Sequence, residues 1–278
     1  MTDALQLKLE RLRAIFAPAR PLIVAFSGGV DSTFVLKVAH DALGDSVVAL
    51  TTTSPTMPEH DRITALEMAR QIGARHLVVA SNELEIAGYA ENPLNRCYLC
   101  KSNLFTVCEA KAAELGIAEI ADGLNLDDLG DYRPGIRAAS ERRVRHPLVE
   151  AELTKAEIRE LSRALGLPTW DKPASPCLSS RFPYGTRITP EGLVMVEGGE
   201  RILHAMGFRV ARVRYHGDVA RLEVETSEVA RLLENRETID RELKKLGFRF
   251  VTVDLRGFRS GSLNEGIAGA NLAPVGHN

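Results

Sequence analysis

The sequence lacks the long apolar runs that a membrane protein needs. Its longest apolar stretch near the start, Leu22 to Phe26, is far shorter than the ~20 residues that span a bilayer. The first twenty residues interleave charged side chains with leucines, which is unlike the uninterrupted apolar core of a signal peptide. We therefore expect a cytoplasmic protein with no membrane partner.

Cysteine is scarce, and neither sign of charge dominates. The 278 residues include four cysteines, 35 basic and 37 acidic residues, which gives a net charge of −2. Four cysteines in a chain expected to be cytoplasmic are more typical of catalysis or metal binding than of disulfides. The balanced charge gives no basis for broad nucleic-acid binding, so we expect no stable nucleic-acid partner. An apolar share of 45% indicates a folded chain, and its length predicts one large domain or two.

Short apolar segments alternate with amphipathic segments over the first part of the chain. The apolar segments are bounded by turn residues and predict strands at 21–26, 46–53, 75–80 and 117–122. The amphipathic segments predict helices at 5–16, 33–43, 58–72, 101–115 and 153–165. Thr154 and Glu157 have the spacing of a capping box at the start of the last helix. This alternation predicts an α/β fold with a parallel sheet and helices on both faces.

The pattern changes after Trp170. Residues 171–185 (DKPASPCLSSRFPYG) are rich in Pro, Ser and Gly and form either a linker or a functional loop. Beyond them the sequence predicts a smaller α+β domain, with helices at about 190–206 and 227–246 and strands at 209–215, 219–225 and 249–255. We divide the chain into a parallel-sheet domain at 1–185, a substrate or oligomerisation domain at 186–270 and a tail at 271–278.

A glycine-rich segment with the sequence SGGVDS stands between the first apolar strand and the following helix. Its two glycines allow tight turns and close approach to an anion, and its serines and the N–H groups of the helix start can donate to phosphate oxygens. The candidate phosphate-binding residues are Ser27, Gly28, Gly29, Val30, Asp31 and Ser32. Asp31 would repel a bare phosphate, so we expect it to act through Mg²⁺ or to orient the loop. The segment is not a Walker A motif, because no lysine follows the glycines; an ordinary glycine-rich turn is the alternative.

In its strand–loop–helix context the SGGVDS segment resembles the PP-loop of the ATP pyrophosphatases. Enzymes of that superfamily cleave ATP to AMP and pyrophosphate and activate a substrate as its adenylate. The resemblance implies ATP and Mg²⁺ as cofactors and a PP-loop domain at residues 1–185. It places adenine near Thr52, at the end of the second strand, and completes the nucleotide crevice with Gly123, at the end of the fourth. Plain turn residues are the alternative at both places.

Three of the four cysteines lie in segments that suggest chemistry. Cys97 and Cys100 form a CxxC just before an expected helix, where two thiolates can share one metal, and zinc binding or redox use is equally open. Cys177 has polar, irregular neighbours, and Arg181 would favour its thiolate; a passive loop cysteine is the alternative. Cys108 lies within a helix and is expected to be a small buried apolar residue.

Five longer motifs narrow the resemblance. They are NPLNRCYLCK at 92–101, ADGLNLDD at 121–128, DYRPG at 131–135, SPCLSSRFPYG at 175–185 and DLRGFRSGSLNEG at 254–266. With the SGGVDS loop they resemble the LarE family, the ATP-dependent sulfur transferases of nickel-pincer cofactor synthesis, over most of the chain. The resemblance implies that the chain adenylates the carboxylates of a pyridinium-3,5-biscarboxylic acid mononucleotide, releases pyrophosphate and converts the carboxylates to thiocarboxylates.

The LarE family has two sulfur routes. One type gives up the sulfur of a single cysteine, at the position of Cys177, and leaves dehydroalanine there. The other type holds a [4Fe–4S] cluster on three cysteines and transfers an extra sulfide. Cys97, Cys100 and Cys177 match the three-cysteine type, so the resemblance favours the cluster and implies a sulfide source. It also implies a homo-oligomer, with a hexamer as one form.

The implied substrate carries a phosphate and carboxylates, and the forked donors of arginine suit both. The arginine candidates are Arg181, Arg212, Arg214 and Arg259, to which the resemblance adds Ser180 and Glu200, with Lys101 and Mg²⁺ to offset charge on the ATP phosphates. Arg212 and Arg214 would share one strand face, which a solvated face would equally explain. Glu200 is either an acid or base or a residue that caps or pairs on its helix. Lys101 is alternatively a solvated helix-start lysine.

The sequence contains two further groups of basic residues. Arg133 and Arg137 flank a Pro–Gly turn and are candidates for lining the nucleotide site. A run at residues 142–146, with three arginines and His146, is expected to be solvated surface.

Three other functions compete with cluster-borne sulfur transfer. A PP-loop tRNA thiolase with a similar cluster would need to bind tRNA, although the sequence offers no obvious RNA-binding module. A non-catalytic nucleotide-binding or zinc-binding module would release no pyrophosphate. Sacrificial transfer of the Cys177 sulfur would make the protein a stoichiometric reagent.

Overall fold

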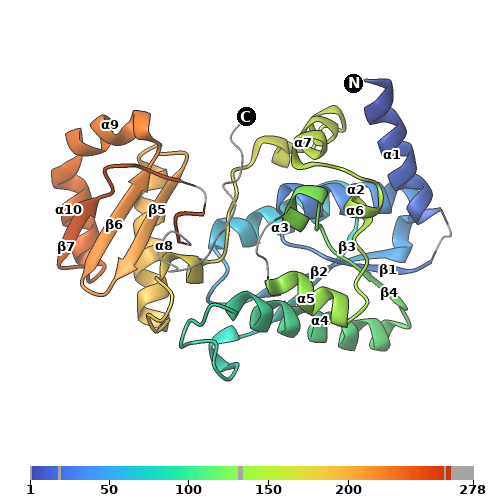
Figure 1. Cartoon of the computed structure of the whole chain (residues 1–278), viewed down its shortest axis with the longest axis horizontal. Helices are drawn as coiled ribbons and strands as arrows, with labels where there is room; N and C mark the ends of the chain where they lie inside the picture. The colour runs from blue at the N-terminus through green and yellow to red at the C-terminus, as the bar shows by residue number, and fades with distance from the viewer. Residues whose placement is uncertain (1, 18–19, 131–133, 260, 264–278) are drawn as a thin grey trace. The chain divides into compact units, whose positions relative to one another are not determined.

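A computed structural model describes residues 2–17, 20–130, 134–259 and 261–263 (Figure 1). The chain divides into two compact units, the first formed by Met1–Glu83 with Asn95–Ser175 and the second by Leu84–Leu94 with Pro176–Asn278. Residues 176–185, which the sequence grouped with the first domain, contact the excursion at 84–94. The side chain of Asn92 donates to the carbonyl oxygens of Phe182 and Pro183, and its own carbonyl accepts from the Gly185 N–H.

The first unit contains a sheet of four parallel strands in the order β3-β2-β1-β4. The strands are β1 (Leu22–Ala25), β2 (Val47–Thr53), β3 (Arg75–Ala80) and β4 (Glu119–Ala121). All four coincide with the expected strands to within two residues at each end. The predicted α/β class with a parallel sheet is confirmed.

Helices cover both faces of this sheet, because β1 is apolar on both sides. Leu22 and Val24 belong to one buried cluster, whereas Ile23 and Ala25 belong to another. The first cluster is closed by α1 (Asp3–Phe16), α2 (Val30–Leu43), α3 (Glu59–Ile72), α6 (Pro147–Glu150) and α7 (Lys155–Ala164). The second is closed by α4 (Arg96–Leu115) and α5 (Pro134–Glu141), which Figure 1 shows across the strands from α2.

The ends of the helices follow local signals where these are present. The capping box at the start of α7 is confirmed, since Thr154 and Glu157 each accept a hydrogen bond from the other's backbone N–H. The expectation that Cys97 and Cys100 precede a helix is wrong, because α4 begins at Arg96. Asn95 is of a residue type favoured as an N-cap, but its side chain makes no capping bond within the described residues, and the first turn is held by the Tyr98 N–H on the Asn95 carbonyl.

The second unit contains a three-stranded mixed sheet in the order β5-β6-β7. Strand β5 (Ala211–His216) pairs antiparallel with β6 (Val219–Val224), and β6 pairs parallel with β7 (Phe250–Val253). Its helices are α8 (Pro190–Ala205), α9 (Val229–Glu234) and α10 (Arg236–Lys245). The single helix expected at 227–246 is interrupted at Asn235, whose side-chain amide donates to the Arg231 carbonyl at 2.8 Å and competes with the helical pattern.

Helix α8 carries two adjacent glycines, of which Gly199 lets it pack closely on β5 and Gly198 lets it pack closely on Leu246, directly after α10. A Cβ on Gly199 would lie 3.0 Å from Cγ2 of Val213, and one on Gly198 would lie 3.0 Å from Cδ2 of Leu246. This close approach fixes the position of Glu200, the next residue of α8.

Short 3-10 turns complete the connections, at Gly44–Ser46, Glu83–Glu85, Leu126–Gly130, Pro168–Asp171, Leu178–Arg181 and Thr226–Glu228. Among the residues that the structure describes, no helix is both long enough and apolar enough to cross a bilayer.

Candidate functional site

The SGGVDS segment forms a loop between β1 and α2 that is held by its own serines. The hydroxyls of Ser27 and Ser32 lie 3.2 Å apart, and the Ser27 N–H points to the Ser32 hydroxyl at 3.3 Å. Gly29 is the N-cap of α2 and supplies no side-chain cap. Within the described residues, the first N–H groups of α2 therefore remain open to an acceptor outside the helix, which suits a phosphate oxygen.

Two glycines allow the backbone to close around this loop. Gly28 has a φ of +68°, and a Cβ there would lie 2.7 Å from the backbone N of Ala65 in α3. Gly123 follows β4, and its Cβ would lie 2.8 Å from the backbone N of Ser32. Any larger residue at either position would push α3 or the β4 connection away from the loop.

The loop lies where the order of strands reverses. From β1 the chain goes to β2 on one side, while β4 returns to the other side of β1. The loop follows β1 and residues 122–125 follow β4, so both lie at carboxyl ends of parallel strands. Ligands of open α/β sheets bind at such a switch point.

Asp31 of the loop is paired with a lysine from a distant helix. Its Oδ2 lies 2.5 Å from Nζ of Lys155, the first residue of α7, and its Oδ1 accepts from the Asn125 amide at 3.5 Å. The pair offsets the charge that would otherwise repel a phosphate. Sequence reasoning missed Lys155, although a lysine in the first helical turn, where the dipole disfavours a cation, was a weak signal.

Polar side chains also follow the neighbouring strands. Thr52 is half-buried near the end of β2, and the hydroxyl of Thr51 donates to the Phe26 carbonyl and lies 2.8 Å from Nε2 of His76. Burial lowers the pKa of His76. Thr51 thus ties the end of β1, directly before the loop, to β2 and β3.

The basic run at 142–146 is not simply solvated, contrary to expectation. Nδ1 of His146 lies 2.7 Å from the buried carboxylate of Asp122, the residue after β4. Arg145 pairs with Glu119 at 3.0 Å and with Glu150 at 2.8 Å. Both side chains bind residues that β4 and α6 bring to them, which the sequence pattern alone does not show.

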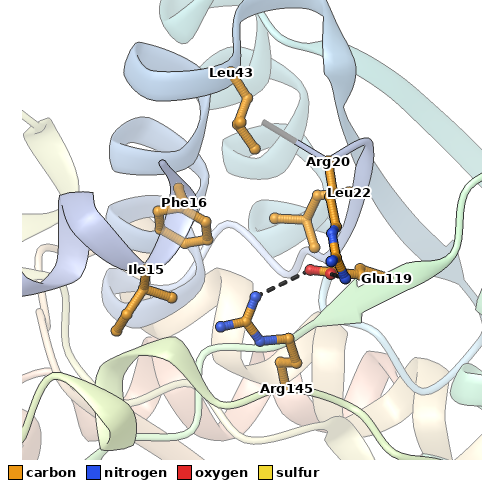
Figure 2. Close-up of a pocket in the computed structure, with 7 residues that line it drawn as sticks. All are labelled: Ile15, Phe16, Arg20, Leu22, Leu43, Glu119 and Arg145. Carbon is orange, nitrogen blue, oxygen red and sulfur yellow. Dashed lines mark hydrogen bonds and ion pairs between the residues drawn. The ribbon is translucent and has the colours of Figure 1, made fainter. Parts of the chain in front are cut away.

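A cavity of about 290 Å³ opens beside Arg145 (Figure 2). Its lining residues are Ile15, Phe16, Arg20, Leu22, Leu43, Glu119 and Arg145. Leu22 and Glu119 begin β1 and β4, so the cavity lies at the amino ends of these strands, opposite the SGGVDS loop. Both arginines are paired with Glu119, and the cavity is no part of the candidate site.

None of the four cysteines forms a disulfide, and they lie in different surroundings. Cys97 is exposed and Cys100 half-buried, three residues apart on the first turns of α4. Asn103, on the next turn, donates to the Ser81 hydroxyl just after β3, so this end of α4 lies at the carboxyl edge of the sheet. Cys177 is half-buried in the second unit. Cys108 is fully buried, as predicted, and burial raises the pKa of its thiol to about 12.

Thiols fit an iron–sulfur cluster by their donor chemistry. Two accessible cysteines at i and i+3 share one face of a helix, a spacing that suits a common metal or cluster. Within the described residues, no three His, Cys, Asp or Glu side chains form a metal-binding group. Because Cys177 belongs to the other unit, its joining Cys97 and Cys100 stays a prediction.

Several of the predicted substrate residues meet in the second unit, in a group we call the arginine cluster (Arg181, Glu200, Arg212, Arg214 and Glu223). Arg181 is 1% exposed, and its Nε and Nη2 donate to the two Glu200 oxygens at 2.8 and 2.7 Å. Its Nη1 donates to the Cys177 carbonyl and to the Ser180 hydroxyl. The fork of Arg181 thus fixes the turn that carries Cys177.

Arg214 extends the cluster onto β5. Its Nη1 donates to the Ser180 carbonyl at 2.9 Å, and its Nη2 lies 2.7 Å from the fully buried Glu223 of β6. Its buried Nε has no hydrogen-bond partner in the described part of the chain. Arg212 shares this face and lies over the Phe258 ring at 5.4 Å. Both arginines are buried, so a solvated strand face is the wrong explanation.

Glu200 is an ionised partner within this cluster. Burial would raise its pKa, but the charge and hydrogen bonds of Arg181, with the nearby Arg212 and the Val213 N–H, hold the pKa below its ordinary value. A carboxylate held ionised in this way orients Arg181 and is poorly suited to donate a proton at neutral pH. Its partners Arg181 and Val213 lie outside α8, whereas the alternative expected it to cap or pair on its own helix.

The remaining candidates have other contacts or lie outside the described residues. Lys101 lies on α4 with its Nζ 5.6 Å from the Phe105 ring centroid. Arg259 follows β7, and its Nη1 donates to Asp254 at 3.3 Å. Arg137 is exposed and pairs with Glu141. Arg133, with most of the DYRPG motif and residues 264–266, is outside the described residues.

The parallel sheet, with its SGGVDS loop at the switch point, defines a PP-loop ATP pyrophosphatase. A family model described as NAD synthase matches residues 11–102. The chain is 38% identical to the pyridinium-3,5-bisthiocarboxylic acid mononucleotide synthase of Lactiplantibacillus plantarum over 267 residues, 96% of this chain and 97% of that protein. It therefore belongs to the LarE family, as its motifs indicated.

Two other relatives differ in how much of their length is similar to this chain. An uncharacterized protein of Synechocystis is 45% identical over 262 residues, 94% of this chain and 98% of that protein. A tRNA-specific 2-thiouridylase of Synechococcus is 32% identical over 209 residues, 62% of this chain but only 56% of that protein. The thiouridylase is thus similar over part of its length, whereas the Synechocystis protein is similar throughout.

Proposed function

We propose that this chain is an ATP-dependent sulfur transferase that converts pyridinium-3,5-biscarboxylic acid mononucleotide to its thiocarboxylates, for nickel-pincer cofactor synthesis. The name and full-length similarity of the Lactiplantibacillus relative support the substrate. The observation that carries ATP use is the SGGVDS loop at the switch point, with its open helix start and with Asp31 offset by Lys155.

Adenylation answers a chemical difficulty. A carboxylate is a poor electrophile because oxide is a poor leaving group. Its oxygen attacks the α-phosphorus of ATP, pyrophosphate leaves, and the acyl adenylate then carries AMP as a good leaving group. The loop N–H groups and the Ser27 and Ser32 hydroxyls bind and orient the phosphates. Asp31 is the loop carboxylate that would hold Mg²⁺, which supplies further neutralisation of phosphate charge when bound.

The arginine cluster supplies the substrate site in this proposal. The unpartnered Nε of Arg214 is a buried donor suited to a phosphate or carboxylate oxygen. Arg212 lies on the same face and adds a second guanidinium. Glu200 and Arg181 act as positioning residues, since their bonds hold Ser180 and the Cys177 turn. Arg259 and Lys101 remain candidates for further anion contacts.

Cys97, Cys100 and Cys177 are the residues that would hold a [4Fe–4S] cluster, which supplies a bound sulfide for transfer when present. A sulfur nucleophile attacks the carbonyl carbon of the adenylate, and AMP leaves. Each turnover then needs one sulfide from an outside source. Cys108 takes no part, since its thiol is buried and its pKa raised.

Sacrifice of Cys177 is the second candidate. Its half-buried thiol lies on a turn fixed by Arg181, so it can act without the other cysteines. The thiolate attacks the adenylate to form a thioester and releases AMP. Loss of the Cα proton of residue 177 and cleavage of its Cβ–S bond then leave dehydroalanine and the thiocarboxylate.

One experiment separates these routes. The protein is purified without oxygen, reconstituted with iron and sulfide, and compared with Cys97→Ala, Cys100→Ala and Cys177→Ala by visible absorption and iron content. About four irons per chain, lost in each variant, would support the cluster. A colourless protein that loses the Cys177 sulfur after ATP and substrate would support sacrifice. Bound zinc without pyrophosphate release would favour a structural module.

The remaining parts of the proposal concern partners and assembly. We propose a cytoplasmic homo-oligomer, for which a hexamer is one form, with the second unit contributing substrate binding or subunit contacts. Sedimentation of the purified chain tests the assembly. The thiouridylase similarity makes tRNA a fair competitor as substrate, and filter binding with tRNA tests it; retention of tRNA at physiological salt would favour a thiolase.

A further inference from the structure

A lysine from outside the phosphate loop reaches the loop backbone. Nζ of Lys172, directly after the 3-10 turn Pro168–Asp171, lies 3.3 Å from the Gly28 carbonyl oxygen and 2.8 Å from Oδ1 of Asp61. The Lys172 side chain is only 16% exposed and that of Asp61 10%. All these residues belong to the first unit. The ammonium is thus held at the loop by one backbone acceptor and one largely buried carboxylate.

The place of Asp61 follows from the packing of α3 on the loop. Asp61 and Ala65 are four residues apart on α3 and share one face. The tight contact between Gly28 and the Ala65 backbone presses that face against the loop. Asp61 also accepts from the Ser175 hydroxyl at 2.6 Å. One carboxylate therefore ties residues 172–175 to the phosphate loop.

The charges near the loop indicate a role for Lys172. The SGGVDS segment contains no lysine, unlike a Walker A loop, and its one charged residue is the acidic Asp31. Lys155 is drawn to Asp31 and offsets that carboxylate first. The Lys172 ammonium has three N–H donors, and within the described residues Asp61 and Gly28 take two of them. One donor is left for an oxygen of a ligand in the loop.

We propose that Lys172 is the phosphate-binding lysine of this loop and that Asp61 is the positioning residue that holds it there. The inference rests on the proposed ATP-using function and names the cation for its polyphosphate ligand. Because the loop itself supplies only neutral donors, the chain adds the cation from the segment that leads to Cys177.

The test is calorimetric titration of the full chain, with Mg²⁺, against ATP, pyrophosphate and adenosine. Lys172→Met is expected to weaken ATP and pyrophosphate binding by about 10- to 100-fold, the range of a charge-assisted hydrogen bond, and to leave adenosine binding unchanged. Lys172→Arg keeps the charge and the pair with Asp61 and is expected to retain part of the ATP affinity. Asp61→Asn is expected to give a smaller loss, again confined to phosphate-bearing ligands.

The matched control is Lys8→Met. Lys8 lies in the same unit, is 26% exposed and pairs with Glu157 at 2.7 Å, on α1 and α7. Its loss is expected to change none of the three affinities. A Lys172→Met protein that loses adenosine and ATP equally, or loses neither, would overturn the inference. If Lys172→Met does not fold, an unaltered ATP affinity in both Lys172→Arg and Asp61→Asn would overturn it.

The proposed function fails in a different way. If the unmodified chain binds neither ATP nor pyrophosphate, ATP use itself is wrong and the inference falls with it. If the unmodified chain binds ATP and Lys172→Met binds it as well, only the role of Lys172 is wrong.

Discussion

The phosphate loop of the first unit and the arginine cluster of the second are both suited to anions but are built differently. The loop is six consecutive residues whose donors are backbone N–H groups and two serine hydroxyls. The cluster joins Arg181, Glu200, Arg214 and Glu223, which come from a 3-10 turn, a helix and two strands. The loop, whose donors are mainly backbone groups, is encoded in one stretch of sequence. The cluster consists of side chains from distant elements, so it forms only after those elements have packed.

The two regions also differ in what burial demands of them. When no ligand is bound, water can satisfy the neutral N–H donors at a helix start, at little cost in free energy. Buried guanidinium groups lose their hydration and are stable only with carboxylate partners and hydrogen bonds. The cluster is therefore expected to depend on every member, and the loop mainly on its shape.

Breaking the cluster is expected to have the largest effect. Arg181→Met leaves Glu200 buried without its main partner and is expected to lower the free energy of unfolding by about 3–5 kcal/mol. Urea unfolding followed by circular dichroism measures this. The control Arg187→Met breaks the Arg187–Glu91 pair, in which both side chains are well exposed, and is expected to cost at most about 1 kcal/mol. Equal losses in the two variants would contradict the contrast.

Changing the shape of the loop is expected to come next. Gly28→Ala forces a non-glycine residue into positive φ and drives its Cβ into α3. We therefore expect the free energy of unfolding to fall by about 1–3 kcal/mol and ATP binding to be lost. Gly44→Ala is the matched control, because Gly44 also has positive φ but a Cβ there would meet no described atom within 4 Å. It is expected to lose less stability and no ATP affinity. The same ATP loss in both variants would show that shape at Gly28 is not decisive.

Removing the Lys155 charge beside the loop is expected to lower ATP affinity while changing the free energy of unfolding only slightly. Lys155 and Asp31 are 36% and 22% exposed, so Lys155→Met is expected to cost only about 0.2–1 kcal/mol of stability. ATP affinity without Mg²⁺ is expected to fall, because Asp31 then repels the phosphates. Calorimetry with and without Mg²⁺ checks this. A stability loss as large as that of Arg181→Met would remove the distinction between loop and cluster.

Acid is expected to act on the cluster through Glu200. Its pKa is lowered in the folded chain from an ordinary value of 4.5, so its stabilising contribution is full above about pH 4.5 and is lost as the pH falls through the folded-state pKa. The stability difference between the unmodified chain and Glu200→Gln should therefore be constant near neutral pH and shrink on acidification. Urea unfolding across this pH range measures it, and a difference that grows in acid would contradict the argument.

The smallest effect concerns the cysteines and involves no mutation. The raised pKa and full burial of Cys108 predict that a thiol reagent at pH 8 labels Cys97, Cys100 and Cys177 in the folded, metal-free chain and spares Cys108. Mass spectrometry of peptides before and after unfolding in urea reads this out. Labelling of Cys108 at the rate of Cys97 would contradict its assignment to the core.

Particular elements show how far the sequence could be interpreted. The strands of the first unit were found because each is a short apolar run between turn residues, and the capping box of α7 marked its helix. The start of α4 was missed although Asn95, a favoured N-cap residue, directly precedes it, and the break at Asn235 was missed because it accompanies a hydrogen bond from the Asn235 side-chain amide to the Arg231 carbonyl. Such errors occur where a local signal is weak and packing decides.

The candidate site divides in the same way. The place of the SGGVDS segment between a strand and a helix was predicted, and Gly123, expected near it, packs against Ser32; that these residues bind a nucleotide stays a prediction. Lys155 and Lys172 were missed, since each lies more than a hundred residues along the chain from its loop contact. Arg212 and Arg214 were placed on one strand face, but their burial depends on β6 and on the segment after β7.

By itself the sequence determined the alternation of strands and helices, the place of the SGGVDS loop between a strand and a helix, and the family. These can be recognised from local spacing, from turn residues and from consecutive motifs. Only the tertiary structure decided which charges meet: Lys155 with Asp31, Lys172 with Asp61, and Arg181 with Glu200. The reason is physical, because an ion pair depends on distances of a few ångströms between side chains that the fold alone brings together.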